Sequence, residues 1–255
     1  MNKKQQDEQR RREDLALKQG LLWVAGAIVL ELLLFLVNRY AFDFDASAQG
    51  VALAESLRTV LAALRLVGLA AFVGGGVFFA LQVKKEGKTA LAGVLCAVGA
   101  VVLVCAHVAV RYHDGGMRML YLLVPVLGGL ALSYYIYQKE FFLSALSSIL
   151  AVLGLWFVRA GGMSADVIGT ILFCAALLIA VLKLKNGDGC LKMGEKALCL
   201  LPKKANYTVM LASCAAALAV QLLAAFAGGA VAYYLIFAMG AWLFAMLVYY
   251  TVKML

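Results

Sequence analysis

The stretch Val60–Val83 reads VLAALRLVGLAAFVGGGVFFALQV and contains one charged residue, Arg65. A helix needs about 20 mostly apolar residues to cross a hydrocarbon layer about 30 Å thick, and this stretch is long enough. Inside that layer the backbone finds no water, and a helix satisfies its own amide and carbonyl groups. The stretch therefore predicts a membrane-spanning helix.

Stretches of this kind fill most of the chain. Of its 255 residues, 65% are hydrophobic and only 15% are charged, whereas a soluble domain carries roughly 25% charged residues. We predict an all-α polytopic transmembrane helical bundle over residues 21–255, preceded by a charged cytoplasmic arm, residues 1–20. About eight helices are expected, at 21–37, 60–83, 89–110, 119–137, 141–158, 167–184, 207–227 and 231–252.

Some landmarks recur along the chain. The lysine pair at 84–85 recurs at 203–204, and Arg39 recurs as Arg159, with offsets close to 120 residues. One interpretation is a duplication into two parallel four-helix halves, since an even helix number gives both halves the same orientation. The other is chance, because apolar segments of low complexity match one another easily.

Basic residues are distributed unevenly between the loops. With a cytoplasmic N-terminus, all fourteen lysines and three arginines fall on the inner side, and six arginines fall on the outer side. Cytoplasmic loops are generally richer in Lys and Arg. We therefore predict a multi-pass protein of the cell (plasma) membrane with both termini in the cytoplasm. Residues 185–206 form its long inner loop, in which mixed leucines and lysines predict a short interfacial helix.

Six polar side chains within or beside the spans are candidates for a ligand-binding site. They are Glu31, Arg58, Arg65, His107, Arg111 and Gln221. Ionisable residues inside a membrane are energetically expensive and usually functional. Arginine binds carboxylate and phosphate through a planar fork. Together these residues predict a cationic vestibule that opens outward above Glu31.

Structural interpretations of the same residues stay open. Glu31 is equally well explained as a hydrogen-bonded residue that joins helices, and Gln221 as an interhelical hydrogen bond. Counting from the inner helix ends puts Arg65 about 12 Å further out than Glu31. A direct ion pair between them is therefore less favoured than an Arg65 that reaches for the outer headgroups.

The sequence predicts no metal, cofactor or catalytic site. HExxH, GxSxG and CxxCH motifs are absent, so an enzyme is the less favoured class. Cys190 and Cys199 lie in the inner loop without CxxC spacing, and ordinary reduced thiols are the favoured interpretation. The net charge of +9 is scattered over short loops, which favours anionic lipid over nucleic acid.

The leading functional hypothesis is a carrier, or a membrane-embedded binding component, for a small anionic solute or lipid. The alternative is a non-catalytic assembly or scaffold subunit of a membrane complex, whose helices pack against membrane protein partners. The bilayer is the expected partner in both cases. The carrier needs a binding site near Glu31, and the scaffold needs only helix surfaces.

The expected topology can be tested by labelling single cysteines from outside intact cells. Cysteines replacing Arg39, His113 and Gly162 should react with a membrane-impermeant maleimide, and those replacing Glu86 and Glu195 should react only after permeabilisation. The reason is that the expected helices place the first three positions in outer loops and the last two in inner loops. Reaction of Glu86→Cys in intact cells would contradict the orientation.

Overall fold

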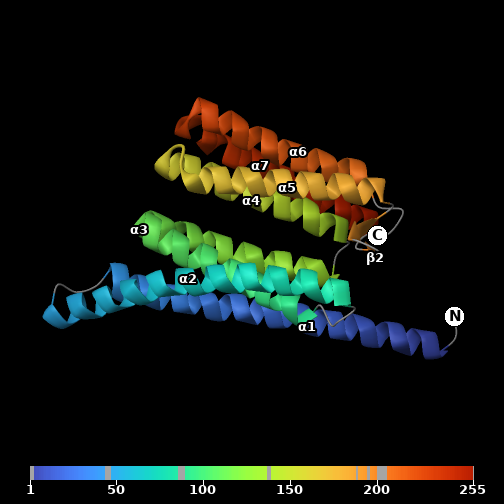
Figure 1. Cartoon of the computed structure of the whole chain (residues 1–255), viewed down its shortest axis with the longest axis horizontal. Helices are drawn as coiled ribbons and strands as arrows, with labels where there is room; N and C mark the ends of the chain where they lie inside the picture. Colours follow the sequence, from blue (N-terminus) through green and yellow to red (C-terminus); the bar gives the residue numbers. More distant parts are fainter. Residues whose placement is uncertain are drawn as a thin grey trace. The chain divides into compact units, whose positions relative to one another are not determined.

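The computed structural model describes residues 3–43, 47–85, 90–136, 139–187, 189–193, 196–199 and 206–254. These residues form a largely helical protein (Figure 1). The helices are α1 (Lys3–Val37), a π-helical turn η1 (Asn38–Phe42), α2 (Ala48–Lys85), α3 (Ala90–Ile136), α4 (Lys139–Gly161), α5 (Ala165–Asn186), α6 (Tyr207–Ala227) and α7 (Gly229–Met254). Two short strands, β1 (Cys190–Met193) and β2 (Lys196–Cys199), lie between α5 and α6.

Helix α3 reverses direction near its middle. His113 has φ 46° and ψ −127°, which is not helical. A Cβ built at Gly116 would lie 2.5 Å from the carbonyl oxygen of Val108, although eight residues of a continuous helix span about 12 Å. The chain therefore folds back, and α3 consists of a first segment (90–112) and a second segment (114–136), both green in Figure 1.

The predicted fold class is confirmed. Among the described residues, seven helices are long and apolar enough to cross a membrane, and the reversal at His113 divides one of them in two. The chain is a multi-pass membrane protein in contact with the lipid bilayer. The charged residues at 3–20 belong to α1, which runs into the first apolar span without a break.

The expected interfacial helix between residues 185 and 206 is wrong for residues 190–193 and 196–199, and residues 200–205 lie outside the described part of the chain. The described part of this loop is an antiparallel hairpin in which Leu191 pairs with Leu198. Its apolar and basic residues alternate along Leu191-Lys192-Met193, and a period of two favours a strand. A helix of so few residues would also be marginal on its own.

The chain forms two compact units. One is Trp23–Gly128, and the other is Gly129–Leu255 together with Met1–Leu22. The division after Gly128 falls inside the expected span 119–137, so it does not coincide with a border between two four-helix halves. The duplication stays a prediction.

Within the unit Trp23–Gly128, α2 packs antiparallel against the first segment of α3 along a seam of glycines. A Cβ at Gly68 would lie 2.7 Å from the Leu103 backbone nitrogen, and one at Gly75 would lie 2.8 Å from that of Cys96. Gly99 meets the backbone of α2 at Phe72 in the same way. Small residues at such positions let two helix backbones approach closely. We call this contact the glycine seam.

In the unit Gly129–Leu255, α4 is the central helix. It contacts α5, α6 and α7, and 67% of the residues in its most apolar stretch are buried. Its buried face alternates small and large residues, such as Ala151, Gly154 and Leu155. This arrangement is typical of the core helix of a bundle.

The glycine seam predicts different effects for two adjacent substitutions. Gly75→Ala should lower the free energy of unfolding by about 1–3 kcal/mol, because the added methyl overlaps the α3 backbone. Gly74→Ala is the matched control, since nothing lies within 4 Å of the position that its methyl group would take, and it should be neutral or stabilising by up to about 1 kcal/mol. SDS titration in mixed micelles measures both. Equal effects would contradict the seam.

Candidate functional site

The depth of Glu31 follows from one hydrogen bond between α2 and the end of η1. Arg58 Nε donates to the carbonyl oxygen of Ala41 at 3.2 Å. Ten residues inward from Ala41 is Glu31, and ten residues inward from Arg58 on the antiparallel α2 is Gly68. Because helices rise about 1.5 Å per residue, Glu31 and Gly68 lie at about the same depth.

The glycine seam shows which residues of α3 lie at the same depth as Glu31 and Gly68. Gly68 lies opposite Leu103, and the contact of Gly116 with Val108 brings Tyr121 of the second segment to the depth of Leu103. Consistent with this, Cys105 and Tyr121 both interact electrostatically with Glu31. We call Glu31, Cys105 and Tyr121 the middle layer.

The middle layer contains unsatisfied polar atoms. Glu31 Oε2 and Tyr121 Oη are both buried, and neither has a hydrogen-bond partner in the part of the chain that the structure describes. Buried polar atoms are normally paired, so each exception needs an explanation. A ligand, a proton or a water molecule at this layer would satisfy them.

Arg65 and His107 lie about one helical turn further out. Arg65 is three residues before Gly68, and His107 is four residues after Leu103, so both are about 5–6 Å outward from the middle layer. Both continue the spacing of three and four residues that faces the glycine seam. We call this pair the arginine layer.

This register gives a smaller backbone offset between Arg65 and Glu31 than the count along the sequence. The α-carbons of the two residues differ in depth by about 5 Å, where the sequence count gives about 12 Å. The sequence count assumed that the apolar stretches of α1 and α2 end at the same inner level, but α1 continues inward from Leu21 to Lys3 whereas α2 ends at Lys85, two residues past Val83. Arg65 is half-buried and makes no ion pair with a described carboxylate, so the direct Glu31–Arg65 bridge is not formed.

The outer layer consists of Phe42, Arg58, Arg111 and His113. The Arg58 guanidinium carbon lies 5.6 Å from the centroid of the Phe42 ring, and that ring meets the His113 imidazole edge-on at 5.9 Å. Arg58 therefore holds the end of η1 against α2, and these contacts occupy part of its guanidinium group. Arg111 is exposed, one turn further out than His107.

Gln221 belongs to the other compact unit. Its side chain is fully buried, and its Nε2 donates to the carbonyl oxygen of Leu150 at 3.3 Å and to Cys174 Sγ at 3.1 Å. Gly154 leaves the space for this amide, since a Cβ there would lie 2.9 Å from Gln221 Oε1. These contacts join α4, α5 and α6 and favour the structural interpretation of Gln221.

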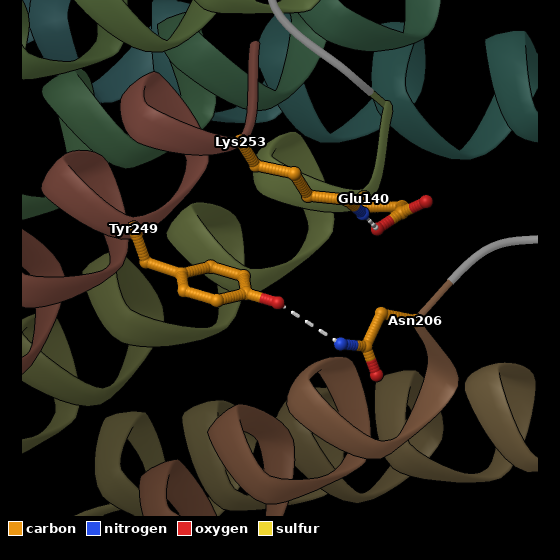
Figure 2. A network of polar contacts seen from close by, with 4 residues as sticks. All are labelled: Glu140, Asn206, Tyr249 and Lys253. Atoms are coloured by element: carbon orange, nitrogen blue, oxygen red, sulfur yellow. Dashed lines mark hydrogen bonds and ion pairs between the residues drawn. The ribbon is translucent and has the colours of Figure 1, made fainter. Parts of the chain in front are cut away.

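Sequence reasoning missed a polar network at one end of the unit Gly129–Leu255. Lys253 Nζ lies 3.0 Å from Glu140 Oε2, and Asn206 Nδ2 donates to Tyr249 Oη at 3.1 Å, as Figure 2 shows. Glu140 is only 3% exposed. The signal was its place in the first turn of α4, where the helix dipole favours an acidic residue, with Lys253 in the last turn of α7.

Neither this network nor the three layers resembles a metal site. Among the residues that the structure describes, no group of three His, Cys, Asp or Glu side chains is placed to hold a metal ion. No family model, curated protein or solved structure matches this chain.

The Glu140–Lys253 pair should stabilise the unit that contains Gly129–Leu255. Lys253→Met should lower the free energy of unfolding by about 2–3 kcal/mol, because it leaves a buried carboxylate without its charged partner. Adding Glu140→Gln should recover part of the loss, with a coupling energy of about 1–3 kcal/mol. Lys139→Met, an exposed lysine beside Glu140, is the control. Strictly additive losses in an SDS titration would contradict the pairing.

Proposed function

We propose that this protein is a carrier, or a membrane-embedded binding component, for a small anionic solute or an anionic lipid headgroup. We place it in the cell membrane with both termini in the cytoplasm. The observation that carries the proposal is the arginine layer: Arg65 lies on the seam-facing side of α2 at the depth of His107, and no described carboxylate pairs with it.

The chemistry of arginine supports an anionic ligand. A guanidinium group stays charged in a membrane, and leaving it half-buried without a counter-ion is expensive. Its planar fork matches the two oxygens of a carboxylate or phosphate. A bound anion would therefore supply the charge that Arg65 lacks, and His107 at the same level adds a hydrogen-bonding ring.

The order of the layers supports a path for such an anion. An anion arriving from outside would meet Arg58 and Arg111 first, Arg65 and His107 next, and Glu31 last. A deprotonated Glu31 repels an anion, whereas a protonated Glu31 donates a hydrogen bond to it. The middle layer therefore provides a place where passage further inward depends on the state of one carboxyl group.

Ligand binding tests the proposal with Arg65→Gln in purified full-length protein. The probes are inorganic phosphate, succinate and mixed micelles that contain phosphatidylglycerol, and the readout is the midpoint of thermal unfolding. At least one probe should raise the midpoint of the wild type. Arg65→Gln should weaken that probe's affinity by about tenfold or more, since charge-assisted hydrogen bonds contribute about 1.5–3 kcal/mol.

The controls separate the arginine fork from overall charge. Arg159→Gln removes an exposed arginine of the other compact unit and should leave the affinity unchanged, whereas Arg65→Lys should give an intermediate affinity. Uptake of the binding probe by proteoliposomes would assign a carrier rather than a binding component. A wild type that no probe stabilises, or an equal response of Arg65→Gln, would overturn the proposal in favour of the scaffold.

A further inference from the structure

The hairpin between α5 and α6 brings together two cysteines that are nine residues apart in the sequence. The strand register pairs Cys190 of β1 directly with Cys199 of β2. The hairpin follows closely on α5, because the amide of Gly189 donates to the carbonyl oxygen of Leu184 at 2.9 Å. The cysteine pair is therefore the end of the hairpin that adjoins α5.

This register satisfies the distance requirement of a disulfide bond. Directly opposed residues of an antiparallel pair have α-carbons about 4.5 Å apart at non-hydrogen-bonded positions and about 5.5 Å apart at hydrogen-bonded ones. Disulfides join α-carbons that are about 4.4–6.8 Å apart. Either kind of position thus allows the bond without movement of the backbone.

The sequence around the pair is basic. Lys192 follows Cys190 by two residues, and Lys183 and Lys185 occupy the last turn of α5. Cations near a thiol stabilise its thiolate, which is the nucleophile in thiol chemistry. By contrast, Cys96, Cys105, Cys174 and Cys214 are free cysteines inside the membrane-spanning helices.

We propose that Cys190 and Cys199 form a redox-active dithiol pair that reacts with small disulfides of the glutathione disulfide class. One thiolate attacks a sulfur of the small disulfide, and a mixed disulfide forms as one small thiolate leaves. The second cysteine thiolate then attacks the mixed disulfide at the protein sulfur and releases the second small thiolate. Two protein thiols are oxidised, one small disulfide is reduced, and the two protons pass to the released thiolates.

The consequence for the chain is a covalent link across the hairpin that connects α5 to α6. In the proposed orientation the hairpin faces the cytoplasm, where glutathione keeps thiols reduced and disulfides are usually transient. The pair is then open at rest and closes under oxidising conditions. This inference does not depend on the proposed anion site.

The experiment uses full-length protein in detergent, equilibrated with mixtures of reduced and oxidised glutathione, alkylated and digested with trypsin. Cleavage after the lysines at 185, 192, 196 and 203 yields the peptides 186–192 and 197–203, which stay linked only if the disulfide has formed. The linked fraction should rise in one two-electron transition and reverse on adding reduced glutathione.

Two variants test whether the register is responsible. In Cys199→Ser with Leu198→Cys, the new cysteine is out of register with Cys190, and the equilibrium constant for closure should fall at least about tenfold, or about 30 mV. Leu191→Cys with Leu198→Cys, in a chain carrying Cys190→Ser and Cys199→Ser, restores an in-register pair and should close. Equal closure of the shifted pair, or only glutathione adducts on the wild type, would overturn the proposal.

Discussion

The close approach of α2 and α3 at the glycine seam sets the depth of the polar side chains in Trp23–Gly128. Gly68, Gly75 and Gly99 bring two backbones within van der Waals contact, so the two helices cannot slide past each other without a clash. Once this register is set, Arg65 and His107 lie at one level. The hydrogen bond from Arg58 to Ala41 and the contact of Gly116 with Val108 then place Glu31 and Tyr121 at the next level. A membrane interior offers little hydrophobic force between helices, and close packing of small residues takes its place.

The apolar spans could be predicted from the sequence because each is set by one local property, its length of uninterrupted apolar residues. The relative depth of Arg65 and Glu31 could not, because it depends on how two helices are staggered. That stagger shows only in the hydrogen bond that Arg58 of α2 donates to the carbonyl oxygen of Ala41 at the end of η1. The turn at His113 was anticipated as a loop, although its short length depends on a backbone conformation that few residues other than glycine adopt.

Other features of the candidate sites depend on pairs of residues that only the fold brings together. Glu140 and Lys253 are separated by most of the unit Gly129–Leu255, and neither stands out alone: one resembles a loop residue and the other a residue of a charged tail. The cysteines at 190 and 199 are similar, since only the strand register makes them neighbours. Gln221 was predicted as a candidate ligand-binding residue, with an interhelical hydrogen bond as the alternative, and its contacts with Leu150 and Cys174 favour the alternative.

The short reversal at His113 also constrains how the chain is inserted during synthesis. The two segments of α3 are joined by so few residues that one segment cannot span the bilayer while the other remains outside it. In the proposed orientation they enter as one hairpin, and Arg111, Asp114 and Arg118 are carried through the hydrocarbon together. Each such charge is unfavourable by about 2.5–3.5 kcal/mol at the centre of the bilayer. The favourable insertion of the two long apolar segments must outweigh this cost.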